Sequence, residues 1–411
     1  MLKTTNHKTT ATIATAALIL SLAGCGSNAA TGSANKTEYA QATQTAQASE
    51  ITQTSAESAT SVATSAAATT ESTSGSSDIY TDRDLQQVAD TSNAKKISLT
   101  SGQNVDITEE GVYVLSGTAT NVSIRVNVDN TKKVQLVLDG VSIENTDTPA
   151  IYVLSADKVF VTTVEGSQNT LSVTGSFVAD GETNLDGVIF SKDDLVLNGK
   201  GTLTISSTDN AVVSKDDLKV TGGTYVVSCW GDAFQANDEV YVADGSFDVA
   251  ADSDGIQGGL LVQIDGGTFN MRAAEGIEST QVRINDGNIS ISATDDGINA
   301  TYKTDDTTIT PSIEINGGTT TVEMGAGDTD ALDSNGNIVI AGGTVTLTGQ
   351  SVFDFDGTGE LTGGTVYVNG EQVTTITNSM MMGGGGMAGG GRMMDGAGGG
   401  MAAGGRMMGL A

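Results

Sequence analysis

A column of carboxylates recurs through the middle of this 411-residue chain at a nearly constant spacing. Its members stand directly before a small residue and an apolar residue, as in Asp232-Ala-Phe and Asp254-Gly-Ile. In several copies a second carboxylate precedes the first by one or two residues. Carboxylate oxygens are the hard ligands that Ca²⁺ prefers, and Ca²⁺ accepts about six to eight of them. The candidate calcium ligands are Asp232, Asp252, Asp254, Glu275, Asp295, Asp296, Asp328 and Asp330.

For each single carboxylate there is an alternative role as a turn residue, because Asp and Asn side chains bond their own backbone well. The column as a whole is harder to explain in that way. Between residues 232 and 330 the chain carries 19 acidic residues and three basic ones, Arg272, Arg283 and Lys303. Like charges placed close together repel one another unless a cation lies between them. We therefore expect at least one Ca²⁺ site, and the body has no His or Cys cluster that would favour zinc or copper.

The elements that must position this column form a sequence repeat of 20 to 31 residues. Each unit contains a glycine, a polar residue and two apolar residues separated by one position, as in Gly201-Thr-Leu-Thr-Ile205 and Gly267-Thr-Phe-Asn-Met271. Alternation with a period of two predicts strands, and a unit of this length holds three short strands joined by tight turns. Units stacked about 4.8 Å apart place the carboxylates along one edge. The predicted fold class is all-β, a single-stranded parallel β-helix or solenoid.

The segments on either side of the repeats have different compositions. Residues 1–24 are predicted to be a lipoprotein signal peptide, with a basic start and an apolar run too short to span a bilayer. The sequence Leu22-Ala-Gly-Cys25 resembles the bacterial lipobox, which implies lipid attachment at Cys25. Residues 25–77, rich in Ser, Thr and Ala, and the Gly- and Met-rich residues 376–411 are predicted to be a disordered linker and tail. The folded β-helix domain is predicted at residues 78–375.

The charge balance limits the possible partners. Fifty acidic residues against 19 basic ones give a net charge of −31. This balance excludes nucleic acid, whose phosphates need stripes of Lys and Arg. It also excludes docking on anionic lipid through a basic patch, so we expect membrane contact through the lipid anchor only. The predicted location is the outer face of the bacterial cell membrane, and the sequence leaves open whether the envelope has one membrane or two.

Several stretches together resemble a bacterial carbohydrate-binding family with a calcium-bearing, pectate-lyase-like, right-handed parallel β-helix. They are Gly111-Val-Tyr-Val-Leu-Ser-Gly117, Val134 to Ile143, and the repeated Gly-Gly-Thr and Asp-Gly-Ile units. The resemblance covers residues 96–370 and implies Ca²⁺ as a cofactor and binding of cellulose and polygalacturonate, without established cleavage. Glu275 in place of Asp, Asn210 in an early unit and an insertion at residues 301–310 depart from the pattern. These departures leave open which units hold a metal.

The sequence thus predicts a monomeric, surface-anchored lipoprotein whose calcium-binding β-helix binds a pectin-like or cellulose-like polysaccharide without cleaving it. One alternative is a polysaccharide lyase acting on uronates, which needs a Lys or Arg base near the metal. Arg272, Arg283 and Lys303 are the candidates for that base, although pairing with acidic neighbours is the expected role of Arg283. A second alternative is a structural adhesin in which Ca²⁺ only staples the coil. Trp230, the single tryptophan, either stacks on a sugar ring or packs into a corner of the coil.

Overall fold

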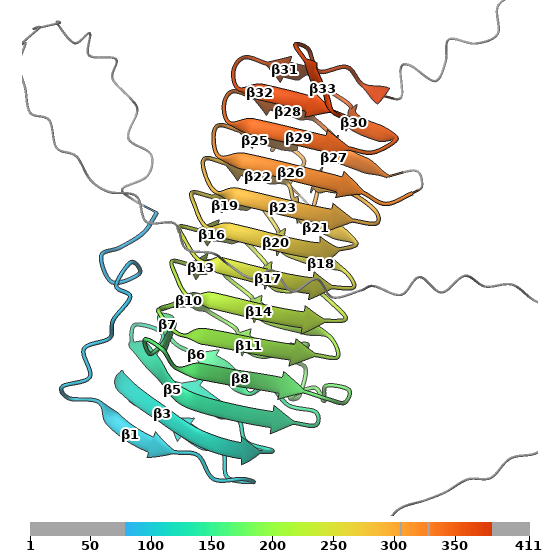
Figure 1. Cartoon of the computed structure of the whole chain (residues 1–411). Helices are drawn as coiled ribbons and strands as arrows, with labels where there is room; N and C mark the ends of the chain where they lie inside the picture. The colour runs from blue at the N-terminus through green and yellow to red at the C-terminus, as the bar shows by residue number, and fades with distance from the viewer. Residues whose placement is uncertain (1–78, 305, 327–328, 380–411) are drawn as a thin grey trace, which may run out of the picture. The chain divides into compact units, whose positions relative to one another are not determined.

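The computed structural model describes residues 79–304, 306–326 and 329–379, and within these residues it is a parallel β-solenoid (Figure 1). All 33 secondary-structure elements of this part are strands, which confirms the predicted all-β parallel coil. No helix capable of crossing a bilayer occurs in the described residues. The predicted signal peptide, the lipobox cysteine and nearly all of the predicted linker and tail lie outside the described residues.

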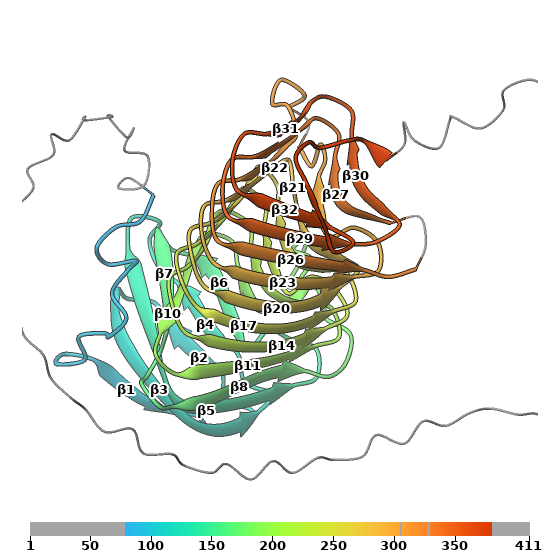
Figure 2. The ribbon, with the colours of Figure 1, turned by 45° about the horizontal axis from the view of Figure 1, so that its top comes forward.

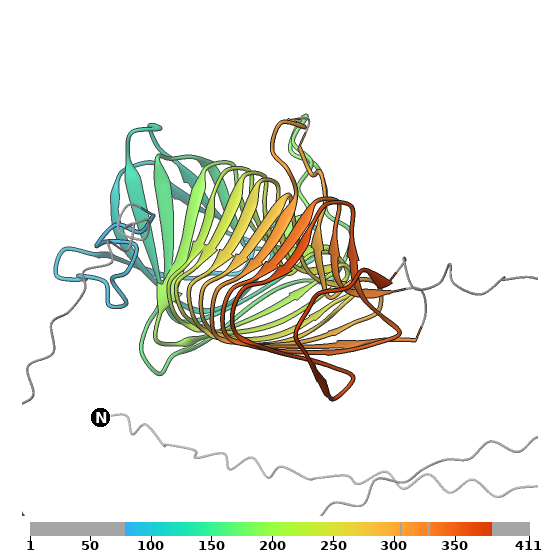
Figure 3. The same cartoon turned by 90° about the horizontal axis from the view of Figure 1, so that it is seen from above.

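Two parallel sheets wind around the coil, and each repeat contributes two strands to the larger sheet and one to the smaller sheet. Figure 3 shows how successive turns follow one another along the stack. The smaller sheet has 11 strands: β2 (Val105–Ile107), β4 (Ile124–Asn127), β6 (Ile151–Ser155), β9 (Gly187–Ser191), β12 (Asn210–Ser214), β15 (Phe234–Ala236), β18 (Asp254–Gly258), β21 (Glu275–Ser279), β24 (Ile298–Ala300), β27 (Asp330–Ser334) and β30 (Ser351–Phe355).

The larger sheet has 22 strands, which alternate between the two remaining sides of each turn. They are β1 (Lys95–Ser98), β3 (Gly111–Thr120), β5 (Lys133–Asn145), β7 (Lys158–Thr163), β8 (Gln168–Val173), β10 (Asp194–Gly199), β11 (Thr202–Ser207), β13 (Leu218–Val220), β14 (Thr224–Cys229), β16 (Glu239–Val242), β17 (Ser246–Ala251), β19 (Leu261–Ile264), β20 (Thr268–Ala273), β22 (Gln281–Ile284), β23 (Asn288–Ala293), β25 (Ser312–Ile315), β26 (Thr319–Met324), β28 (Asn337–Ile340), β29 (Thr344–Thr348), β31 (Gly359–Leu361), β32 (Thr365–Val368) and β33 (Glu371–Val373). Only β33 pairs antiparallel, with β32.

The core of the coil is built from inward-facing columns, because each strand pairs in register with its copy one repeat later. In the middle turns the register aligns Tyr225 with Phe247 and Phe247 with Phe269. The rings of Tyr225 and Phe247 stack with centroids 5.3 Å apart, and those of Phe247 and Phe269 stack at 4.4 Å. Phe234, from the smaller sheet, meets Phe247 edge-on at 5.6 Å. Stacked and edge-to-face rings at these separations stabilise a core beyond their buried area.

Residues 79–94, which we call the strap, cross the outer face of the larger sheet before the coil begins (Figure 2). The Tyr80 hydroxyl donates to Asp265 Oδ2 over 2.9 Å, so the strap starts beside the turn after β19. Asp84 is fully buried, and its carboxylate lies 3.6 Å from Lys158 Nζ on β7. Gln87 accepts from the Gly199 amide and donates to the Thr221 carbonyl. These contacts fasten the strap across several turns.

The aromatic stack predicts a large loss of stability when its central ring is removed. Phe247→Ala deletes a side chain that is 3% exposed and leaves a cavity between two rings. The expected loss in the free energy of unfolding is about 3–5 kcal/mol, measured by urea unfolding. Ser246→Ala, on the exposed face of the same strand, is the control and is expected to change stability by about 0.5 kcal/mol or less. Equal stability of the two variants would contradict the packing described here.

Candidate metal centre

The carboxylate column that the repeat predicts lies at the start of the strands β15, β18, β21, β24 and β27 of the smaller sheet. The register places Asp254 opposite Glu275, and Asp330 opposite Ser351 in the last turn. Pairing of Phe234 with Ile256 and of Ile277 with Ile298 brings Asp232 and Asp296 into the same column. The sequence therefore positions an acidic ladder along one edge of this sheet.

A second polar column runs beside the first, and the sequence analysis missed it. A Cβ on Gly255 would lie 3.1 Å from the sulfur of the buried Met271, so a side chain at this position would point into the core. The side chain of Ile256 is buried in the core as well. Asp254 and Gln257 are left on the outer face, where Gln257 Nε2 donates to Asp254 Oδ2 over 3.0 Å. The sequence does contain a signal for this second column, because its residues stand three positions after those of the first column in each repeat. The register-linked members are Gln235, Gln257, Glu278, Asn299, Asp333 and Asp354.

The two columns together form a compact group of oxygens, the carboxylate cluster of Asp254, Glu275 and Glu278. One oxygen from each side chain lies within 4.8 Å of the others. Asp254 and Glu278 are only 5% and 7% exposed. Gln257 Nε2 also donates to Glu278 Oε2 over 3.1 Å, so Gln257 bridges Asp254 of the first column and Glu278 of the second. Asn299 Nδ2 donates to Glu275 Oε2 over 3.1 Å, while the buried Asn299 Oδ1 has no hydrogen-bond partner among the described residues.

Burial destabilises the ionised form of the three carboxylates in this cluster. Loss of solvation, followed by repulsion from Asp232 and Glu278, raises the pKa of Asp254 to about 8. Burial and then the neighbouring Glu278 raise the pKa of Glu275 to about 7. The Lys303 ammonium contacts Glu278, so three carboxylates and one ammonium carry a net charge of −2. A divalent cation would cancel that charge.

The donor chemistry of the cluster fits Ca²⁺. The clustered ligands are carboxylate oxygens, with no nitrogen or sulfur donor among them. Asn299 now presents Nδ2 to Glu275, and its amide oxygen would join them when the amide turns over. Hard oxygen sets favour Ca²⁺ over softer transition metals. Asp254, Glu275, Glu278 and Asn299 are therefore the residues that would hold the ion. Two of these four, Asp254 and Glu275, belong to the candidate set that the sequence identified.

A further acidic group lies in later turns of the same edge. The Asp330 amide donates to Asp296 Oδ1 over 3.0 Å, which ties two rungs together. Burial and the charges of Asp295, Asp330 and Asp354 raise the pKa of Asp296 to about 6. Burial and the charges of Asp296, Asp354 and Asp330 raise the pKa of Asp333 to about 7. This group extends the acidic ladder beyond the carboxylate cluster.

The remaining predicted ligands have other surroundings. Asp232 Oδ1 accepts from the Asp254 amide over 3.1 Å, and its Oδ2 accepts from Gln235 Nε2 over 2.9 Å. Its carboxylate thus bonds the backbone of the next rung, which differs from the local turn role, bonding to its own backbone, that the sequence left open. Asp252 and Asp295 are exposed in the turns that precede the edge. Asp328 lies outside the described residues.

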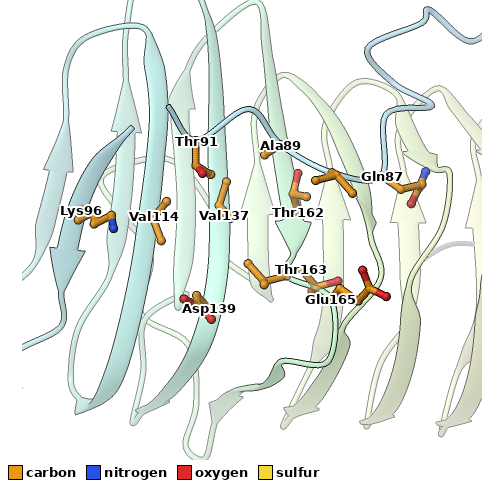
Figure 4. A pocket seen from close by; sticks show the side chains of 12 residues that line it. Gln87, Ala89, Thr91, Lys96, Val114, Val137, Asp139, Thr162, Thr163 and Glu165 are labelled. Carbon is orange, nitrogen blue, oxygen red and sulfur yellow. The ribbon is translucent and has the colours of Figure 1, made fainter. Parts of the chain in front are cut away.

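A second set of carboxylates and an enclosed groove lie away from this edge. Asp216, Asp217 and Asp238 bring their oxygens within 4.8 Å at the opposite end of the smaller-sheet strands. A groove of about 290 Å³ lies beneath the strap, between its residues 87–91 and the outer face of β3, β5 and β7 (Figure 4). Apolar side chains such as Val114 and Val137 line it. Neither feature shares a residue with the carboxylate cluster.

The fold and the edge together define an all-β parallel solenoid with an acidic ladder along its smaller sheet. The chain belongs to the carbohydrate-binding domain-containing protein family, whose model matches residues 101–357. A carbohydrate-binding domain-containing protein of Acetivibrio thermocellus is 35% identical over 130 residues, which are 31% of this chain and 46% of that relative's length. The match thus spans less than half of the relative.

A solved structure is also similar to this chain. It is the gadolinium derivative of a polysaccharide lyase-like protein from C. thermocellum, with a TM-score of 0.40 and 25% sequence identity. The similarity covers 66% of this chain and 96% of that chain.

The raised pKa values predict that the cation-free protein loses stability as the pH rises. Asp254 and Glu275 titrate at about 8 and 7 in the folded state, but near 4 in the unfolded chain. The folded state therefore binds more protons between these limits, and the free energy of unfolding falls from about pH 4 to about pH 8. Thermal unfolding in chelator should show a midpoint that decreases across this window.

Asp254→Asn removes the larger of these two shifts and should flatten the pH dependence of the unfolding midpoint. Glu182→Gln, at an exposed position outside the carboxylate cluster, is the matched control and should keep the wild-type slope. A wild-type midpoint that rises between pH 5 and 8 in chelator would contradict the described electrostatics.

Proposed function

We propose that this protein is a surface-anchored β-helix that binds Ca²⁺ on its acidic edge and uses it to bind an acidic polysaccharide without cleaving it. The observation that carries the proposal is the buried carboxylate cluster with the unpartnered Asn299 oxygen beside it. Membership of the carbohydrate-binding domain-containing family supports a glycan as the partner. The substrate class we propose is polygalacturonate or a related pectin, with cellulose-like chains as the alternative.

The charge of the protein explains why the cation would matter for binding. A chain of net charge −31 repels a polymer of uronates when nothing lies between them. A cation held by Asp254, Glu275 and Glu278 would keep open positions for oxygens from outside, because Ca²⁺ takes about six to eight ligands. Carboxylates of the glycan are suitable ligands for those positions. Binding of uronates should therefore depend on Ca²⁺, whereas binding of neutral cello-oligosaccharides should not.

The proposed location is the outer face of the bacterial cell membrane, reached through lipid on Cys25. The support is the lipobox-like sequence at residues 22–25 and the Ser-, Thr- and Ala-rich stretch that follows it. A lipid chain would supply membrane affinity to a strongly acidic protein. Replacement of Cys25 by Ser should move the protein out of the membrane fraction, as followed by immunoblotting. Retention in that fraction would contradict the anchor.

A polysaccharide lyase is the second candidate, because Lys303 lies beside the carboxylate cluster. In that reaction a base removes the proton next to the uronate carboxyl, a C=C bond forms and the C–O bond to the leaving sugar breaks. Bound Ca²⁺ would supply the acidification of that proton. Arg283 does not serve this purpose, since it pairs with Glu314 at 3.0 Å on the other sheet. Lys303 already contacts Glu278, and for this reason we place the lyase second.

The decisive experiment combines calcium titration with glycan binding. Isothermal titration of the chelated protein should show Ca²⁺ binding that Glu275→Gln weakens tenfold or more, with Glu182→Gln unchanged as the control. Polygalacturonate should retain the wild-type protein in Ca²⁺ and release it in chelator, while circular dichroism shows that the fold persists. Binding of polygalacturonate by folded, chelated protein would contradict the bridging role.

The same incubations distinguish the two candidate functions. A non-cleaving binder produces no ultraviolet absorbance from unsaturated uronates after long incubation with Ca²⁺ and polygalacturonate. An increase in that absorbance that Lys303→Ala abolishes would establish the lyase instead. Calcium binding without retention on any glycan would leave the structural adhesin as the function.

A further inference from the structure

Trp230, the only tryptophan of the chain, stands out on the surface of the coil. It lies between β14 and β15, two residues before Asp232, and its side chain is 68% exposed. It therefore does not pack into the corner of the coil, which was one of the two roles that the sequence suggested. A ring exposed to this extent contributes little to the stability of the fold, and tryptophan is enriched at binding surfaces because its large apolar face is available for stacking.

An open groove of about 510 Å³ lies beside this ring. Its floor comes from the last residues of neighbouring strands, because the register aligns Ser228 of β14 with Ala250 of β17, Arg272 of β20 and Ser292 of β23. The small side chains of Ser228, Ala250 and Ser292 in this column leave room next to the indole. We call this surface the Trp230 groove; its polar lining is Ser228, Asp252, Arg272, Ser292 and Thr294.

Arg272 gives the groove a charge that is unusual on this protein. Its side chain is exposed and makes no ion pair or hydrogen bond with the residues that the structure describes. The two other basic residues of the acidic region are both paired, Arg283 with Glu314 and Lys303 with Glu278. A guanidinium without a carboxylate partner is suited to bind a carboxylate from outside through two parallel hydrogen bonds.

We propose that the Trp230 groove binds sugar rings of a uronate-containing glycan, with Trp230 stacking on a ring and Arg272 pairing with a carboxylate. The C–H face of a sugar is apolar and matches the face of an indole. Ser228 and Ser292 offer hydroxyls to the polar rim of the ring. Asp252 repels a second carboxylate and so favours the orientation that places the uronate charge at Arg272. This inference rests on the proposed polysaccharide binding and adds a contact site that does not require the cation.

The single tryptophan makes this proposal directly measurable in the full chain. Trigalacturonate should shift the Trp230 emission to shorter wavelength and protect it from acrylamide, whereas cellotriose should do so much more weakly. The shift should persist in chelator, at reduced affinity. Arg272→Gln should weaken trigalacturonate binding about fivefold or more while leaving the response to cellotriose unchanged.

Calorimetry with Trp230→Ala supplies the complementary measurement, since that variant lacks the fluorophore. Its affinity for trigalacturonate should fall about fivefold or more, with circular dichroism confirming the fold. Val178→Ala and Lys200→Gln change an exposed apolar and an exposed basic residue outside the groove and should bind as the wild type does.

The outcomes separate this site from the proposed function. Wild-type affinity in both Trp230→Ala and Arg272→Gln would overturn the groove as a binding site but leave calcium-dependent glycan binding intact. Equal responses to trigalacturonate and cellotriose would overturn the assignment of the ligand as a uronate. Absence of any glycan binding by the wild type, with or without Ca²⁺, would overturn both proposals.

Discussion

The in-register pairing of parallel strands is the constraint on which the rest of this structure depends. Each residue is stacked on its equivalent one repeat away, so a residue type that recurs at one position of the repeat forms a continuous column. Inside the coil this produces the stack of Tyr225, Phe247 and Phe269. On the smaller sheet it produces the acidic ladder. Core and edge are thus two results of the same geometry. Stacking of similar apolar side chains stabilises the core, whereas stacking of carboxylates creates a repulsion that other groups must offset.

Compensation at the edge comes from several kinds of group. Side-chain amides donate hydrogen bonds to the carboxylates, as Gln257 does to Asp254 and Glu278. Backbone amides of the next rung donate to side chains such as Asp232 and Asp296. Lys303 adds a positive charge from an insertion between two strands. The pKa values of Asp254 and Glu275 stay above their usual range because these contacts do not fully replace water.

The columns of the coil could be predicted from the sequence because they repeat. The strands, the core positions and the first acidic column, including Asp254 and Glu275, follow from the period alone. Glu278 and Asn299 also recur, three residues after the first column, but their outward orientation depends on how the chain turns at Gly255 and its equivalents, which the period does not give. Lys303 and the strap lie outside the repeat, so no neighbouring unit indicates where they pack. The exposure of Trp230 likewise could not be predicted, because no equivalent turn carries a tryptophan that would indicate how the ring packs.

The strap determines where mechanical load enters the molecule. The chain joins the described fold at Ile79 and Tyr80, whose contacts with Lys219 and Asp265 lie beside β13 and β19 rather than at the first turn. A pull through the preceding residues would therefore act on the flank of the coil and would load the contacts at Tyr80, Asp84 and Gln87 in sequence before reaching β1. Under such a force the contacts of the strap would break one after another, while the paired strands of the coil stay hydrogen-bonded.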